Sequence, residues 1–264
     1  MNYLQAAKDW GWVALPAVGF GTVSIMGALV TRENQVSQWC MHQWCKLACK
    51  GVGLKPRLVN GELLDSAPQA VLVSNHLSLL DILVLGAVVK RDYRWMAKEG
   101  VFKVPFLGWH LTAAGHIPVA RGEKAKAENR QLPHLIHEVF EEGADVLIFP
   151  EGTRSPDGQI KDFRIGAFRT AVTENKPILP LVIRGTGGLM AKGRLEISEA
   201  HAREDITVTV LPPVWAPEEG DDKSRAEALR DAVHGIYTDT LYHPVAGRIT
   251  PITAASRQPA VAGG

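Results

Sequence analysis

The chain has 264 residues, a net charge of +1 and a hydrophobic fraction of 46%. This length suits one sizeable domain with an appendage, and it is ample for a buried core. The balanced charge gives no indication of nucleic-acid binding, since any basic patch must be local. The three cysteines lie within residues 40–49, which excludes a disulfide framework and favours a reducing compartment.

An uncharged stretch, residues 11–30, follows a short polar start. A helix of roughly 20 apolar residues is long enough to cross the hydrocarbon core of a membrane. A cleaved signal peptide is the competing interpretation, but Lys8 is the only base ahead of the stretch, and no small-x-small cleavage site follows. Because Pro16 and the glycines 19, 21 and 27 weaken the helix, we predict either a full span or a kinked, half-inserted segment.

A second segment, residues 39–54, has the features of an interfacial helix. Trp39 and Trp44 are suitable anchors at a membrane surface. A trail of basic residues accompanies and follows them: Lys46, Lys50, Lys55 and Arg57. We therefore predict that residues 1–57 form membrane-binding helices at the inner membrane, with the active site on the cytoplasmic face.

The same segment contains a cluster of potential zinc ligands, Cys40, His42, Cys45 and Cys49. Their spacing fits no common zinc site, and Cys45 and Cys49 stand at helical i,i+4 positions. Small apolar residues on a buried or membrane-facing helix are the simpler interpretation, so no metal is predicted.

From residue 58 onward, short strands alternate with helices. Strands are predicted at 70–74, 93–97, 116–120, 145–149, 178–183, 195–198 and 206–211. Helices are predicted at 79–89, 132–140 and 167–174, and a last helix opens at a capping box formed by Ser224 and Glu227. The predicted fold class is α/β, with a single mixed, largely parallel sheet flanked by helices behind the N-terminal membrane-associated element. The main domain is expected over residues 58–243, and the tail 244–264 is predicted to be disordered.

A histidine and an aspartate directly follow the strand 70–74, in Asn75-His-Leu-Ser-Leu-Leu-Asp81. Sheet proteins place reactive groups at the carboxyl ends of strands, and His76 suits a general base whose ring Asp81 orients. Five positions in a continuous helix correspond to about 500° of rotation, so the pair requires His76 in the turn before the helix and Asp81 in its first turn. The structural alternative is that Asp81 only caps the helix, because Ser78-x-x-Asp81 is itself a capping box.

Cations or hydrogen-bond donors follow three further strands. The segment Phe149-Pro-Glu-Gly-Thr-Arg-Ser155 comes directly after the strongest strand, and its glycine permits close backbone approach to a ligand. Thr153 and Arg154 supply donors for a phosphate, and Lys98 and Arg121 follow two other strands. Each cation alone is more simply a solvated surface charge. Together, at one edge of a parallel sheet, they favour a phosphate-bearing substrate.

Four blocks in this order resemble the glycerolipid acyltransferases: Asn75-His76-x4-Asp81, Gly115-x-Ile117-x3-Arg121, Phe149-Pro-Glu-Gly-Thr-Arg154 and Pro177-Ile-Leu-Pro180. The whole is most similar to the 1-acyl-glycerol-3-phosphate (lysophosphatidic acid) acyltransferase family over residues 68–183. Two departures stand out. Arg164 occupies a position where the family often has a lysine, and Gly100 interrupts the usual Glu-Leu after Lys98. They leave the chemistry unchanged and leave the acceptor open.

The resemblance implies an enzyme that moves a fatty acyl group from acyl-CoA or acyl-carrier protein to the free hydroxyl of 1-acyl-glycerol-3-phosphate, making phosphatidic acid. His76 would take the proton from that hydroxyl, and Asp81 would orient and stabilise the imidazole. The implied phosphate site consists of Glu151, Gly152, Thr153, Arg154 and Arg121, with Lys98 nearby.

The implied partners are a membrane lipid acceptor, the acyl-thioester donor and the bilayer; neither a cofactor nor nucleic acid is implied. Three alternatives remain at this level. Another lysolipid, such as a lyso-ornithine lipid, is a possible acceptor. A lipid ester hydrolase lacks support because the sequence has no Gly-x-Ser-x-Gly elbow. A non-catalytic lipid-binding scaffold leaves the His76–Asp81 pair unexplained.

Overall fold

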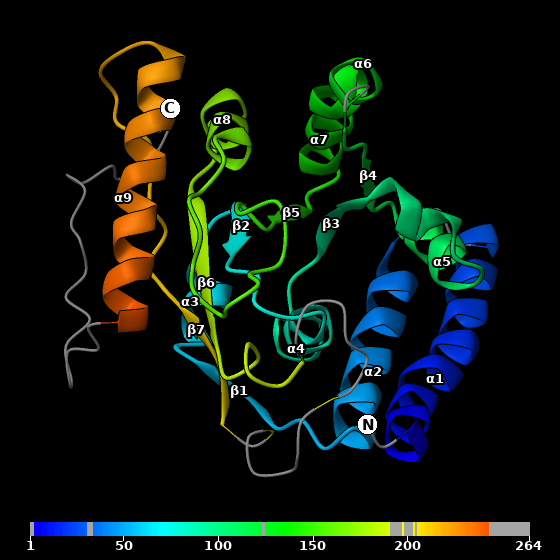
Figure 1. The fold of residues 1–264 in the computed structure, drawn as a ribbon. Helices are drawn as coiled ribbons and strands as arrows, with labels where there is room; N and C mark the ends of the chain where they lie inside the picture. The colour runs from blue at the N-terminus through cyan, green and yellow to red at the C-terminus, as the bar shows by residue number, and fades with distance from the viewer. Residues whose placement is uncertain are drawn as a thin grey trace.

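The computed structural model describes residues 3–30, 34–122, 125–190, 197, 203 and 205–242. Figure 1 shows the arrangement of the elements. In chain order they are α1 (Tyr3–Val30), α2 (Gln35–Gly51), β1 (Pro56–Val59), α3 (Glu62–Ser66), β2 (Val71–Ser74), α4 (Leu80–Val88), β3 (Tyr93–Lys98), η1 (Glu99–Lys103), α5 (Leu107–Ala113), β4 (Ile117–Val119), α6 (Ala125–Glu128), η2 (Asn129–Gln131), α7 (Leu132–Glu141), β5 (Asp145–Ile148), α8 (Gly166–Thr173), β6 (Ile178–Arg184), β7 (Ile206–Val210) and α9 (Asp222–Tyr242).

The strands form a seven-stranded sheet in the order β1-β7-β6-β2-β5-β3-β4. From β6 to β4 every neighbouring pair is parallel, whereas β7 is antiparallel to β6 and parallel to β1. The predicted mixed, largely parallel sheet is therefore confirmed. Because β2, β5, β3 and β4 run in one direction, the segments that follow them leave the sheet at the same edge.

Two apolar layers cover the faces of the sheet. Leu72 of β2 packs with α2 and α4 in one layer, and Val71 and Val73 pack with α7, α8 and α9 in the other. All four residues of β2 are buried. A central parallel strand that is covered on both faces has this pattern, which explains why β2 appears in the sequence as a continuous apolar run.

Helix α1 presents two apolar faces. One packs on α2 and α5, and it buries Val13 and Ser24. The opposite face exposes large apolar side chains: Leu4, Trp12, Leu15, Val18, Val23, Met26, Leu29 and Val30. The helix is long and apolar enough to cross a membrane, and 17% of its most apolar window is buried. An apolar face of this size on the described surface indicates that α1 associates with a membrane.

Polar contacts attach α1 to the rest of the molecule. Asp9 forms a buried ion pair with Arg203 at 3.2 Å, and Trp44 of α2 donates to the backbone oxygen of Val13 at 2.9 Å. The helix runs without interruption past Pro16. Helices α1 and α2 pack on α5 and α4, and the predicted domain boundary at residues 57 and 58 falls within β1.

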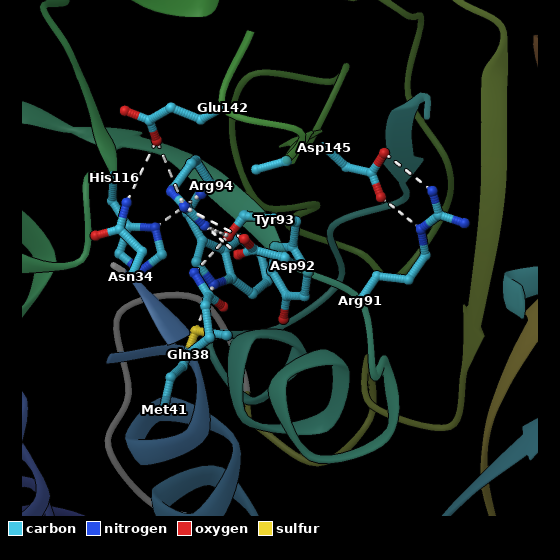
Figure 2. Close-up of polar contacts among 12 residues, drawn as sticks. Asn34, Gln38, Met41, Arg91, Asp92, Tyr93, Arg94, His116, Glu142 and Asp145 are labelled. Atoms are coloured by element: carbon cyan, nitrogen blue, oxygen red, sulfur yellow. Dashed lines mark hydrogen bonds and ion pairs between the residues drawn. The ribbon is translucent and has the colours of Figure 1, made fainter. Parts of the chain in front are cut away.

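Buried polar contacts also fix α2 and β3 against the centre of the sheet (Figure 2). Gln38 donates to the backbone oxygen of Tyr93 at 2.9 Å. Arg91 binds both carboxylate oxygens of Asp145 at 2.5 and 3.1 Å, and Asp145 also accepts the N–H of Ala70 at 2.7 Å. The Asp145 carboxylate thus joins the start of β5 to the loops before β2 and β3. These contacts fix how the three strands are aligned along their axes.

The last helix begins differently from the prediction. It starts at Asp222, and the carboxylate of Asp221 accepts the N–H of Ser224 at 2.8 Å. Asp221 is therefore the cap, and the predicted box of Ser224 and Glu227 is wrong. The predicted strand 195–198 and the tail 244–264 lie outside the described residues, apart from Ile197.

Candidate active site

His76 lies in the turn between β2 and α4, as its pairing with Asp81 requires. Helix α4 begins at Leu80, so Asp81 is in its first turn. The distance between His76 Nδ1 and Asp81 Oδ2 is 2.9 Å. The aspartate side chain is fully buried, whereas 14% of the histidine side chain is exposed. The predicted geometry of the pair is confirmed.

The Asp81 carboxylate both caps the turn and holds the histidine ring. Its Oδ2 atom also accepts the N–H groups of Leu77 at 2.7 Å and Ser78 at 2.8 Å. An ionised carboxylate only accepts, so the proton of the neutral imidazole sits on Nδ1 and leaves Nε2 as the acceptor atom. The capping interpretation and the orienting one therefore both describe this residue.

Side chains add to the backbone pairing of β2 and β6 where the two strands approach the active-site edge. The hydroxyl of Tyr237 on α9 accepts the N–H of Leu181 at 3.1 Å and donates to the backbone oxygen of Val73. Further along, the amide of Asn75 accepts the N–H of Ile183 at 2.8 Å and donates to its oxygen at 2.9 Å. These inserted groups fix the direction in which the chain leaves β2.

An aromatic stack sets the plane of the histidine ring. His76 lies on Phe149 with a centroid distance of 4.0 Å and an interplanar angle of 14°. Phe149 in turn stacks on Trp95 at 5.7 Å. Together with the Asp81 hydrogen bond, this stack restricts both rotation and tilt of the imidazole. In the sequence, Phe149 stands out only as part of a motif, and nothing there indicates this stacking role.

The loop after β5 is tied to the histidine turn by two hydrogen bonds. Glu151 accepts the N–H of His76 at 2.8 Å, and the N–H of Ser155 donates to the oxygen of His76 at 2.8 Å. Burial raises the pKa of Glu151 to about 7, against the opposing effect of the His76 N–H. The N–H groups of residues 76–78 are therefore all bound to carboxylate oxygens.

Gly152 and Arg164 are in close contact. The φ of Gly152 is +71°, and a Cβ at this position would lie 2.7 Å from Arg164 Nε. The backbone N–H of Arg164 also donates to the oxygen of Pro150 at 2.8 Å. The arginine thus lies directly against the loop predicted to bind phosphate. Its position in place of the family's lysine was the only signal in the sequence that pointed to it.

The other predicted cations lie along the same edge of the sheet. Lys98 ends β3, Arg121 follows β4, and Arg154 lies in the loop after β5 with Gly152 and Thr153. Lys98 and Arg121 are exposed and Arg154 is half-buried. No residue in the described part of the chain forms a hydrogen bond or ion pair with these three charged groups.

The cysteines and histidine of α2 serve packing. Cys40, Cys45 and Cys49 are free and buried, and a Cβ on Gly86 of α4 would lie 2.4 Å from Cys45 Sγ. His42 pairs with the backbone oxygen of Gly86 at 2.8 Å. Among the described residues, no group of three or more His, Cys, Asp or Glu side chains could hold a metal ion.

Comparison with known proteins gives matches of sequence and of fold. An acyltransferase family model matches residues 55–184. The 1-acyl-sn-glycerol-3-phosphate acyltransferase BAT2 of Brassica napus chloroplasts is 34% identical over 167 residues, which cover 63% of this chain and 45% of that protein. The chain thus matches less than half the length of this relative.

Two further relatives match over most of the chain. A 1-acyl-sn-glycerol-3-phosphate acyltransferase of Chlamydomonas reinhardtii is 30% identical over 87% of this chain and 68% of its own length. One of Saccharomyces cerevisiae is 29% identical over 88% of this chain and 77% of its own length.

The crystal structure of the 1-acyl-sn-glycerophosphate (LPA) acyltransferase PlsC from Thermotoga maritima shares the fold. Its TM-score is 0.71 at 20% identity, over 91% of this chain and 97% of that one. The part of this chain that the family model matches includes the histidine turn and the Glu-Gly-Thr-Arg loop. The chain therefore belongs to the 1-acyl-glycerol-3-phosphate acyltransferase family.

Proposed function

We propose that this acyltransferase moves a fatty acyl group from acyl-CoA or acyl-carrier protein to the free hydroxyl of 1-acyl-glycerol-3-phosphate, which yields phosphatidic acid. The observation that carries the proposal is the His76–Asp81 pair, which Glu151 and Ser155 join to a loop that carries Arg154. The printed names of the sequence relatives support the same substrate class.

In this reaction His76 Nε2 takes the proton of the acceptor hydroxyl while the hydroxyl oxygen attacks the thioester carbonyl carbon. The carbon–sulfur bond then breaks, and the thiolate leaves with the proton that His76 returns. The Asp81 carboxylate stabilises the imidazolium formed between these two steps. Because the N–H groups of residues 76–78 are occupied, a donor to the oxyanion must come from elsewhere in the site.

The acceptor phosphate is proposed to bind the loop after β5 and the neighbouring strand ends. Gly152 and Thr153 supply close backbone approach and donors, and Arg154 and Arg121 supply charge, with Lys98 nearby. Arg164, which lies against Gly152, is added to this group. Glu151 contributes to the site through the backbone of His76, where its carboxylate is bound.

The test is an assay of the purified full-length protein with a panel of lysolipids and both donor classes. His76→Ala is expected to abolish transfer to 1-acyl-glycerol-3-phosphate while the variant keeps its thermal unfolding transition. The matched control is His134→Ala, because the side chain of His134 is 73% exposed on α7 and pairs with Glu138. An unchanged rate of acyl transfer by His76→Ala would refute the mechanism.

The panel also separates the alternatives. Preference for a lyso-ornithine acceptor, which carries no phosphate, would move the function to another lysolipid. Release of free fatty acid instead of transfer would identify a hydrolase. An inactive wild-type protein with every donor and acceptor would favour a lipid-binding scaffold.

We further propose that residues 1–57 serve as the membrane element and residues 58–243 as the catalytic domain, at the cytoplasmic face of the inner membrane. The exposed apolar face of α1 supports the first assignment. The basic residues between 46 and 57 support the cytoplasmic side. A protease-protection assay on intact spheroplasts tests the orientation, since catalytic-domain epitopes would be protected there.

A further inference from the structure

An exposed apolar cluster lies on the segment between β3 and β4, which leaves the active-site edge. Phe106 is 39% exposed, Trp109 is 54% exposed, and their ring centroids are 5.0 Å apart. Val104, which is 45% exposed, belongs to the same segment. We call residues 104–109 the aromatic turn. Grouped side chains of this kind indicate contact with a partner rather than with water.

The backbone of the aromatic turn is strained. Phe106 has φ +60° and ψ −52°, and the N–H of Leu107 donates to the oxygen of Pro105 at 2.7 Å. These features define a γ-turn with positive φ, which is rare and costly for a residue with a side chain. Gly108 keeps the turn tight, because a Cβ there would lie 2.0 Å from the oxygen of Phe102. This strained turn carries the two exposed aromatic rings, those of Phe106 and Trp109.

The aromatic turn is fixed beside α1. The oxygen of Phe106 lies 3.6 Å from the position that a Cβ on Gly21 would occupy. Close by, His110 Nδ1 and Ser24 Oγ form a buried hydrogen bond of 2.8 Å. Figure 1 shows α5 alongside α1. The exposed aromatics are therefore adjacent to a helix whose free face is apolar and long enough for a membrane.

We propose that the aromatic turn is a second membrane contact, in which Phe106 and Trp109 insert into the interfacial region of a lipid bilayer. Tryptophan is favoured there because its ring is apolar and its N–H finds polar partners. A lipid surface is the chosen occupant because the turn lies beside α1, whose free face exposes large apolar side chains. Only η1 separates the turn from Lys98 at the active-site edge, so the contact brings that edge to the bilayer surface.

The first test measures depth in the membrane and does not depend on the proposed function. Trp109→Cys and the control Trp215→Cys are labelled with a polarity-sensitive fluorophore in vesicles of phosphatidylethanolamine and phosphatidylglycerol. Trp215 is a matched control because it is 45% exposed and follows Val214, which pairs with Ile178 at the opposite edge of the sheet. Selective labelling is feasible because the native cysteines are buried, and burial raises the pKa of Cys49 to about 12.

A label at residue 109 is expected to shift to the blue and to be quenched by lipids with a nitroxide on the acyl chain. A label at residue 215 is expected to be quenched by aqueous iodide instead. Equal quenching of both labels by iodide would overturn the proposal. Shielding of residue 109 that needs no lipid and grows with protein concentration would also overturn it, in favour of a second copy of the chain.

The second test rests on the proposed function and asks whether the contact aids access to membrane-bound acceptor. Trp109→Ser is expected to lower kcat/KM about tenfold for acceptor embedded in vesicles and to leave a water-soluble short-chain acceptor unaffected, because burial of part of one indole corresponds to about a tenfold effect. Trp215→Ser should change neither value. Equal losses with both acceptors would contradict the role in access.

Discussion

Replacement of Glu151 by glutamine retains an oxygen that accepts the N–H of His76 and removes the titratable proton. Burial raises the pKa of Glu151 from 4.5 to about 7 in the folded protein. The folded state therefore holds the proton more tightly than the unfolded state does. Stability from this group is complete below the unfolded pKa and is lost as the pH rises through the folded pKa.

A shift of this size corresponds to about 3 kcal/mol, since each pKa unit is worth about 1.4 kcal/mol. The unfolding free energy of wild type should fall by up to that amount between about pH 5 and pH 8 relative to Glu151→Gln. Chemical denaturation in detergent, at a series of pH values, measures the difference. Glu62→Gln is the control, because that residue is exposed on α3.

The glutamine variant should therefore gain stability over wild type as the pH rises, whereas the Glu62 variant should not. Parallel pH curves for wild type and Glu151→Gln would refute the inference that burial holds the proton on this carboxylate. If Glu151→Gln retains transfer activity at low pH, the hydrogen bond from residue 151 to the N–H of His76, and not a negative charge at residue 151, positions the histidine turn.

Three further changes test other contacts. Asp81→Asn, which keeps the shape but not the charge beside His76, should lower kcat by about 10³-fold with little change in KM, as steady-state kinetics would show; a small effect would leave Asp81 as a cap only. Gly152→Ala places a Cβ against Arg164 at positive φ and should cost more than about 1 kcal/mol by thermal unfolding, whereas Gly166→Ala meets open space and should not. Asp9→Asn removes the charge that pairs with the buried Arg203, which should cost about 3 kcal/mol and increase hydrogen exchange in the first turns of α1; unchanged exchange would argue against the pair as an anchor.

Local patterns in the sequence were sufficient for the central strands and the histidine turn. The apolar run at 70–74 and the spacing of His76 and Asp81 each depend on a few neighbouring residues. The partners of the turn were not predictable in this way. Glu151 is 75 residues from His76, and Ile183 is 108 residues from Asn75, so these contacts exist only once the sheet has formed.

The burial of charged side chains was a second feature that could not be predicted from the sequence. Arg94 is 1% exposed although it is an arginine, because Asp92 on the same strand end binds its guanidinium. The N-cap of α9 was a third such feature, because Asp221 and Ser224 are both good capping residues and only the path of the backbone decides between them. The capping-box motif in the sequence favoured Ser224, whereas the structure has Asp221 as the cap.

Tyr237 makes the structure around the histidine turn depend on a helix that is synthesised late, α9. Its hydroxyl binds the backbone of both Val73 and Leu181 and so links α9 to β2 and β6 just before the histidine turn. A nascent chain that already contains His76, Asp81 and the loop after β5 still lacks this link until α9 has emerged from the ribosome. The contact that joins the two strands behind the histidine turn therefore forms only after α9, the last helix in the described part of the chain, has been synthesised.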